Sequence, residues 1–193
     1  MKTLIQKSVN EIVIKNSRFI CILVPLISDD ITSIMDSIKE EYPKATHYCY
    51  AYLYQDRYRS SDDGEPGGTA GMPILNVLQK EGTTNLLCVV VRYFGGIKLG
   101  AGGLVRAYTK SVTETLKNSS FQEMEKGYKI KISFSYEEEK NITYILHNSE
   151  ILTKDYVDMI TYTCFVNDTT LEQLTKYHPE ILENCFIKKL NES

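Results

Sequence analysis

Nine of the eleven glycines in this 193-residue chain fall into two clusters that flank one strongly apolar run. The first cluster reads SSDDGEPGGTAGMP over residues 60–73, and the second reads RYFGGIKLGAGGLVRAY over residues 92–108. Glycine loses more conformational freedom on folding than any other residue, so such clusters require unusual backbone angles or close backbone approach. The two clusters therefore predict a site built on tight loops, on either side of a strand at 85–92.

The bulk composition, with 42% hydrophobic residues, is typical of a globular protein. No N-terminal apolar segment follows basic residues, so we expect no signal peptide. The longest apolar stretches, 20–27 and 86–91, are too short to cross a bilayer, and no membrane partner is expected. The five cysteines lack CxxC spacing, which favours reduced core cysteines in the cytoplasm and argues against a structural zinc site.

Charge is unevenly distributed along the chain. Residues 1–120 carry 14 basic and 12 acidic side chains, whereas residues 121–193 carry 8 and 13. The first part also contains every arginine, namely Arg18, Arg57, Arg59, Arg92 and Arg106. Because arginine suits bidentate phosphate contact, the asymmetry directs any anion-binding role to the N-terminal part.

The spacing of apolar residues predicts two α+β domains, at 1–122 and 127–193, joined by a short polar linker. For the first domain we expect strands at 9–14, 18–26, 46–54 and 85–92, and helices at 31–43, 72–80 and 101–118. For the second we expect a strand at 128–136, a helix at 137–148, two strands within 151–166 broken near 154–155, a helix at 168–177 and a strand at 182–190. The βαββαβ order of the second domain is that of a ferredoxin-like unit.

The second glycine cluster predicts an anion site, because it connects a buried strand to the start of a helix. Unpaired amides and the helix dipole attract anions at that position, and glycines let a ligand approach the backbone. The candidate residues are Arg92, Gly95, Gly96, Lys98, Gly100, Gly102, Gly103 and Arg106. The spacing matches neither GxxxxGK[ST] nor GxGxxG, and a tight loop needed only for helix–strand packing is the alternative.

The first glycine cluster carries three carboxylates, Asp62, Asp63 and Glu65. Carboxylates on a loop can hold a magnesium ion, for which Asp62 and Asp63 are the candidate ligands. They can equally cap Arg57, Arg59 or the amides of the helix that begins near Gly71, and this metal-free reading is favoured. His47 shares a strand face with apolar residues, which is typical of a satisfied core histidine rather than a catalyst.

An aromatic row precedes two of the arginines. The row consists of Tyr48, Tyr50, Tyr52 and Tyr54, with Arg57 and Arg59 following. Aromatic side chains interleaved with arginines on a sheet can stack single-stranded bases. The favoured alternative is that a helix covers this face and that the tyrosines belong to the core.

Four segments together carry a specific resemblance to a known family: SRFI, ATHYCYAY, SSDDGEPGGTAGMPIL and VVVRYFGGIKLGAGGLVRAY. They resemble the signature of the IMPACT family, in its bacterial YigZ-like branch, over roughly residues 10–118. Gly67 stands where the family often has Ser or Ala. The resemblance implies an N-terminal domain folded like the second domain of a small-subunit ribosomal protein. It also implies a ferredoxin-like C-terminal domain similar to those of elongation factor G.

The resemblance further implies a role in translation, since eukaryotic members regulate it and RNA or ribosome binding is inferred for bacterial ones. We therefore expect a non-enzymatic cytoplasmic protein that binds RNA or the ribosome, without a cofactor. One alternative is an enzyme acting on a phosphate ester or nucleotide, with a magnesium ion at the acidic loop. Another is a protein-binding module of translational stress regulation, with the acidic C-terminal domain as its docking surface.

Overall fold

The computed structural model describes residues 1–189, which divide into two compact units with the boundary after Gln122. Both units combine an antiparallel sheet with helices, so the expected α+β class is confirmed. Residue 190, the end of the last expected strand, lies outside the described residues. Within residues 1–189, no helix combines the length and the apolar character needed to cross a bilayer.

Unit 1 is built on a five-stranded antiparallel sheet of order β2-β3-β6-β4-β5. The strands are β2 (Ser8–Ile14), β3 (Ser17–Pro25), β4 (His47–Tyr54), β5 (Arg57–Ser61) and β6 (Leu86–Tyr93). β6 lies at the centre, and every residue from Leu86 to Arg92 is buried. This burial accounts for its uninterrupted apolar sequence, because a strand covered on both faces has no solvent side to keep polar.

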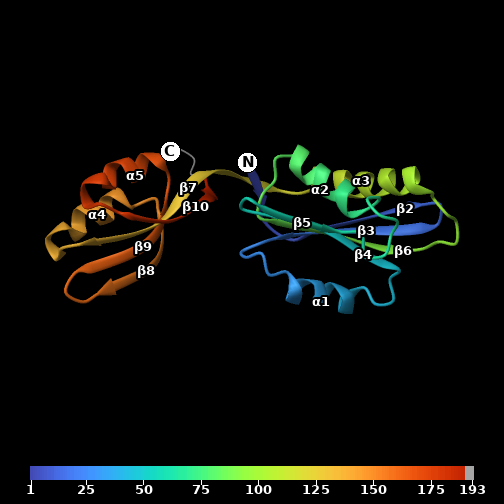
Figure 1. Ribbon diagram of the computed structural model, residues 1–193, viewed down its shortest axis with the longest axis horizontal. Helices are drawn as coiled ribbons and strands as arrows, with labels where there is room; N and C mark the ends of the chain where they lie inside the picture. Colours follow the sequence, from blue (N-terminus) through green and yellow to red (C-terminus); the bar gives the residue numbers. More distant parts are fainter. Residues whose placement is uncertain (190–193) are drawn as a thin grey trace. The chain divides into compact units, whose positions relative to one another are not determined.

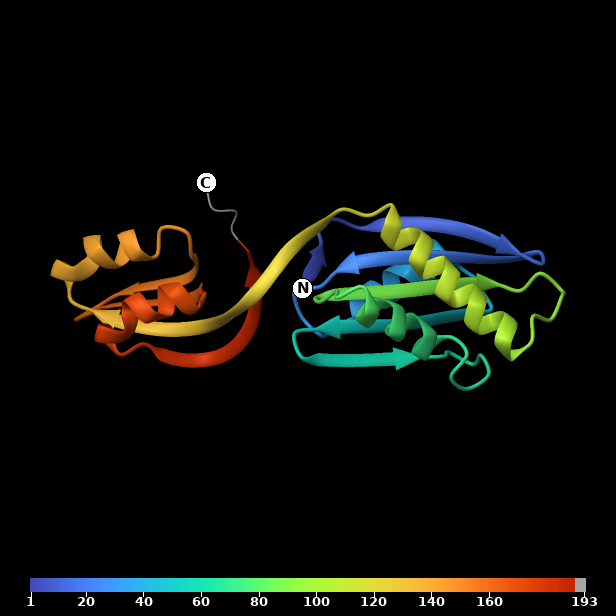
Figure 2. The same cartoon turned by 90° about the horizontal axis from the view of Figure 1, so that it is seen from above.

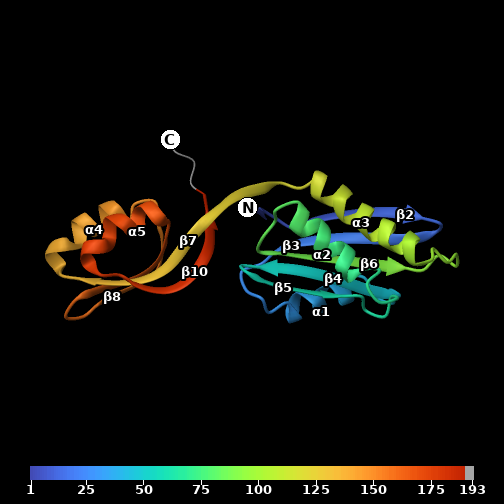
Figure 3. The same ribbon diagram turned by 45° about the horizontal axis from the view of Figure 1, so that its top comes forward.

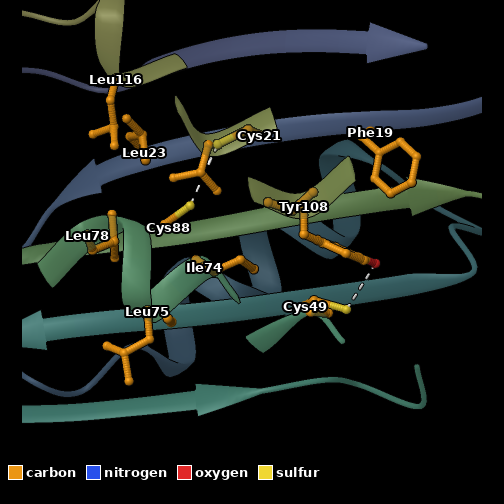
Figure 4. Packing of buried hydrophobic residues seen from close by; sticks show 14 of the residues in the cluster. Phe19, Cys21, Leu23, Cys49, Ile74, Leu75, Leu78, Cys88, Tyr108 and Leu116 are labelled. Carbon is orange, nitrogen blue, oxygen red and sulfur yellow. Dashed lines mark hydrogen bonds between the residues drawn. The ribbon is translucent and has the colours of Figure 1, made fainter. Parts of the chain in front are cut away.

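Helices cover both faces of this sheet (Figures 1 and 3). α2 (Gly71–Lys80) and α3 (Ala101–Lys117) lie on one face, and α1 (Thr32–Glu41) lies on the other. Figure 4 shows the core beneath α2 and α3, where Leu75, Leu78 and Leu116 meet side chains of the sheet. Two thiols of this core, Cys21 and Cys88, lie 3.6 Å apart without a disulfide.

The tyrosine row of β4 faces α1. Its four side chains are partly buried against the core cluster that contains Ile38 of α1. The hydroxyl of Tyr48 donates to the Tyr42 carbonyl at 2.6 Å, and that of Tyr54 donates to the Ile27 carbonyl at 2.9 Å. The row therefore belongs to the core, as the favoured interpretation predicts, and it does not form an open platform for bases.

Unit 2 has the element order β7, α4, β8, β9, α5, β10, which is the predicted βαββαβ order. The bounds are β7 (Phe121–Phe134), α4 (Glu139–Ile145), β8 (Glu150–Tyr156), β9 (Ile160–Val166), α5 (Asp168–Leu174) and β10 (Glu180–Lys188). Short 3-10 turns at Tyr136–Glu138 and Thr175–Tyr177 extend the two helices. β7 pairs with β9 and β10, and β9 pairs with β8, all antiparallel.

Three expectations were wrong in detail. β7 begins at Phe121 and runs unbroken to Phe134, as Figure 2 shows, so the segment expected to be a polar linker is strand. The break between β8 and β9 falls at residues 157–159 rather than 154–155. Two strands were missed, β1 (Lys2–Leu4) and β5, because β1 is very short and β5 is a polar edge strand without apolar alternation.

The loop after β6 passes very close to the two-residue turn between β2 and β3. The amide of Gly95 donates to the Ser17 hydroxyl at 3.1 Å. A Cβ atom at Gly95 would lie 2.0 Å from the carbonyl carbon of Asn16, so only glycine fits there. This contact fixes the start of the second glycine cluster against the sheet.

The Gly95→Ala variant should be strongly destabilised, by about 3 kcal/mol, because the obstacle is backbone that cannot step aside. Gly102→Ala is the matched control, since its Cβ would meet only the end of the Arg106 side chain at 3.5 Å. Alanine's better helix propensity should leave that variant unchanged or up to about 1 kcal/mol more stable. Urea unfolding of both variants measures the difference. Equal stabilities would show that the close approach does not constrain the loop.

Candidate anion-binding site

Arg92 does not lie on the surface, which corrects the expectation that it contacts phosphate. Its side chain is only 6% exposed, and Nη1 donates to Oε1 of Glu65 at 2.6 Å. The guanidinium also lies over the rings of Phe19 and Phe94. An arginine that already has a buried carboxylate and two aromatic faces is engaged within the fold. Arg92 therefore connects β6 to the first glycine cluster.

Glu65 is the centre of a buried polar cluster. It is 3% exposed, and besides Arg92 it accepts a hydrogen bond from the Tyr108 hydroxyl of α3 at 2.7 Å. Nε2 of His47 lies 3.8 Å from its second oxygen, while Nδ1 donates to the Asp63 carbonyl at 2.8 Å. One carboxylate thus joins a loop, a central strand and a helix, and His47 is satisfied within the fold as expected.

The thiol nearest to this cluster is held in its protonated form. Sγ of Cys49 lies 3.2 Å from the Tyr108 hydroxyl, as Figure 4 shows, and 2.9 Å from the Asp62 carbonyl. Burial raises the pKa of the Cys49 thiol to about 12, and burial also raises the pKa of Tyr108 well above its ordinary value. Because the thiolate is the reactive form, Cys49 is a structural residue and not an activated nucleophile.

The acidic loop is turned into the fold. Both oxygens of Asp62 accept backbone hydrogen bonds, Oδ2 from Gly68 at 2.8 Å and Oδ1 from Ala70 and Gly71 at 3.0 and 2.8 Å. Asp63 accepts from the Tyr48 amide at 2.6 Å. The arrangement is the cap on the α2 amides that the metal-free reading predicts. Residues 1–189 contain no group of three or more His, Cys, Asp or Glu placed to hold a metal ion.

The fold accounts for four of the five glycines in the second cluster. Gly95 is required by the close approach to Asn16, and Gly96 and Gly100 have φ angles of 84° and 70°, which favour glycine. A Cβ at Gly103 would lie 3.1 Å from Cβ of Leu99. Gly102 alone has neither a positive φ nor a close neighbour, since only Arg106 Nη1 lies within reach. Its lack of a side chain leaves the backbone open to solvent at the second residue of α3.

The backbone amides at the start of α3 also lack partners within the helix. The amide of Leu104 is the first to bond back, to the Gly100 carbonyl at 2.9 Å. The amides of the three preceding residues have no acceptor in a preceding helical turn. Lys98 and Arg106 are exposed beside this terminus, and no ion pair within residues 1–189 involves either.

Arg57 and Arg59 do not join this group. They lie on β5, which forms one edge of the sheet, whereas β2 forms the other edge. Four strand spacings separate β5 from β2, a distance of roughly 19 Å. Arg57 is paired with Asp29 at 2.6 Å, whereas Arg59 is exposed. The structure therefore places Arg106 beside Gly102, with Lys98 exposed in the loop that leads to them. Arg92 is buried and the β5 arginines lie on a different strand, so neither joins this group.

Sequence reasoning missed two residues that organise the site. Tyr108 lies four residues after Leu104, and this helical spacing marks a buried face but gives no sign of a carboxylate partner. Ser17 lies between the strands expected at 9–14 and 18–26, yet it is fully buried and its hydroxyl accepts from both Arg92 and Gly95. Neither partnership is visible in sequence, because Ser17 is 75 or more positions away from both donors.

Neutralising the central carboxylate by Glu65→Gln should destabilise the protein by about 3–5 kcal/mol, because it leaves the buried Arg92 guanidinium uncompensated. Tyr108→Phe removes one hydrogen bond to the same oxygen and should cost about 1–2 kcal/mol. Chemical denaturation gives both values. A Glu65→Gln variant no less stable than Tyr108→Phe would contradict the central role of the ion pair.

Asp62→Asn should lower stability at neutral pH by about 1–2 kcal/mol, because the amide group replaces one of two acceptor oxygens. Burial raises the pKa of Asp62, but three backbone hydrogen bonds outweigh it and hold the pKa below its ordinary 3.8. A lowered pKa contributes stability above the ordinary value that is lost as pH falls through the folded-state pKa. The gap between wild type and variant should therefore narrow below about pH 4. Thermal unfolding across pH checks this, and a gap independent of pH would contradict it.

A family model and individual proteins similar to this chain all point to the same family. The Impact N-terminal domain family matches residues 15–116. The chain is 37% identical over 178 residues to IMPACT family member YvyE of Bacillus subtilis, which covers 89% of this chain and 82% of that protein. It is 41% identical over 115 residues to IMPACT family member YigZ of Escherichia coli, a match spanning 56% of each chain.

A solved structure described as that of a hypothetical protein covers 99% of this chain and 98% of its own, with 27% identity and a TM-score of 0.71. The family match includes the SRFI segment, both glycine clusters and the strand between them. The chain therefore belongs to the IMPACT family.

Proposed function

We propose that this protein is a non-enzymatic, cytoplasmic RNA-binding protein that acts in translation, and that it holds RNA phosphates at the N-terminus of α3. The observation that carries the proposal is that the Arg106 guanidinium lies beside the exposed backbone of Gly102. The glycine exposes backbone that the fold itself does not need exposed, and the neighbouring guanidinium has no carboxylate partner among the described residues.

Three features of the site suit a phosphate. The free amides at the start of α3 point to where an anion sits at a helix terminus, and the helix dipole adds about half a positive charge there. Arg106 offers a planar fork of donors, and Lys98 adds a point charge from the loop. Because the protein groups named here all contact RNA phosphates and none contacts a base, the expected binding is insensitive to base sequence.

The proposal agrees with the ribosomal-type fold that the family resemblance implies for the N-terminal domain, although fold alone does not assign function. The residues of the magnesium-dependent alternative are already occupied, since Asp62 caps α2 and Glu65 is paired with Arg92. The acidic surface required by the protein-docking alternative lies in a different unit from the unpaired cations Lys98 and Arg106. The RNA-binding proposal therefore relies on Lys98 and Arg106, which form no ion pair within residues 1–189.

Binding of a short single-stranded RNA should weaken steeply between about 50 and 200 mM salt, because phosphate contacts release counterions. Arg106→Gln should reduce the slope of log affinity against log salt by about 0.7, the contribution of one phosphate on a single strand. Gly102→Ala should also weaken binding, since its Cβ would occupy the space next to the free amides. Fluorescence anisotropy with labelled RNA gives both results.

Lys117→Gln is the control for net charge, because it removes one charge, paired with Glu114 at 3.8 Å, from the other end of the same helix. It should change the salt slope much less than Arg106→Gln. If the two variants behave alike, only net charge matters and the site is not at the start of α3. If wild type shows no salt-sensitive binding at all, the proposed function is wrong, and capture of a protein partner that survives high salt and nuclease would favour the docking alternative.

A further inference from the structure

A recess of about 230 Å³ opens beside the first turns of α3, and it shares Arg106 with the proposed phosphate contacts. It lies between α3 and the end of the β2–β3 hairpin. Its walls include Ile14 and Leu99, and Gly103 contributes backbone without a side chain. Three cations line it: Lys15 from the hairpin turn, and Arg106 and Lys110 from successive turns of α3. Lys15 and Lys110 were not among the residues expected from sequence.

None of these three cations is neutralised within the described part of the chain. The ion pairs of residues 1–189 take up Arg18, Arg57 and Arg92, but they include none of the recess cations. Three positive side chains around one depression repel one another, so an anion placed between them is favoured. The same geometry does not arise on β5, where Arg57 is paired with Asp29.

Lys15 stands in a backbone conformation that suits other residues better. The turn Lys15–Asn16 joins β2 to β3 with φ angles of 45° and 61°. Two-residue turns with positive φ at both positions strongly favour Asn and Gly, so the backbone gives no reason for lysine at the first position. The close contact between Gly95 and Asn16 holds this turn in place. Lys15 therefore lines the recess from a turn whose backbone is held in place.

The number of cations around the recess indicates the class of anion. An internal phosphodiester of RNA carries one negative charge and is matched by cations spaced along a strand. A phosphate monoester carries about −1.5 to −2 at pH 7 and three acceptor oxygens. Three cations that line a single recess match the monoester better, and the arginine among them can bind two of its oxygens at once.

We propose that this recess binds a phosphate monoester through Lys15, Arg106 and Lys110. The inference deepens the proposed function and rests on it for one of the two sources of the ligand, the 5′-phosphate end of an RNA strand. The other source is a free nucleoside monophosphate. Both present the same dianionic group, and Ile14 and Leu99 provide an apolar wall for the attached nucleoside.

The test compares two RNAs of identical sequence that differ only in a 5′-phosphate or a 5′-hydroxyl. Wild type should bind the 5′-phosphate RNA about tenfold more tightly, which corresponds to about 1.4 kcal/mol. Lys15→Asn removes the cation and gives the turn a residue that suits positive φ, so the protein should be at least as stable while the preference disappears. Lys110→Gln should also abolish the preference, and Lys117→Gln should retain it.

The outcomes separate this inference from the proposed function. Equal affinity of wild type for the two RNAs, with salt-sensitive binding of both, overturns the monoester site and leaves the proposed function standing. If neither RNA binds but a nucleoside monophosphate gives a thermal shift that Lys15→Asn removes, the proposed function fails and the recess binds a free phosphate monoester. If neither RNA nor nucleoside monophosphate binds, both proposals fail. A preference for 5′-phosphate that persists in Lys15→Asn also overturns the assignment of the recess.

Discussion

The ion pair between Glu65 and Arg92 is the interaction on which the arrangement of unit 1 depends. It is almost fully buried, and one carboxylate oxygen receives both the guanidinium and the Tyr108 hydroxyl. Removing one partner of such a pair is costly, because the remaining charge has no access to water. The first glycine cluster, the central strand and α3 are therefore held to one another by charge as well as by apolar contact. The loop between β6 and α3 begins two residues after Arg92, so the ion pair with Glu65 also fixes where this loop starts.

The two glycine clusters have different roles. Most of the first cluster is used by the fold, since Asp62 caps α2, Glu65 is buried, and a Cβ at Gly71 would meet the Ser61 backbone at 2.8 Å. Gly67 is the exception, with neither a positive φ nor a neighbour within 4 Å of its Cβ position. In the second cluster most glycines are likewise required by backbone geometry, but Gly102 is not. The site proposed above rests on the combination of such a glycine with unpaired cations, which the first cluster lacks. Glycine content alone does not separate the two clusters.

Much of the architecture was predictable from sequence, and the exceptions have physical causes. The apolar run of β6 and the helical spacing in α3 depend on local periodicity, so both elements appear close to their expected bounds. β5 was missed because an edge strand carries polar residues on exposed positions and shows no alternation. Arg92 was expected on the surface because its partner, Glu65, lies 27 residues earlier. Sequence alone does not distinguish a buried, paired arginine from an exposed one. Lys15 and Lys110 were missed for the same reason, since only the packing of α3 along the β2–β3 hairpin brings them together.

The contact of Gly95 with Asn16 also bears on when the recess comes into existence. Lys15 is made early in synthesis, whereas Arg106 and Lys110 follow some ninety residues later. No N-terminal fragment that ends before α3 contains the full set of cations, and no local hairpin can assemble it. Because the turn contacts Gly95, which follows β6, anion binding would distinguish the finished domain from intermediates in which β6 has not yet paired with β3. An anion bound there would stabilise the native state alone, by an amount set by its concentration relative to its dissociation constant.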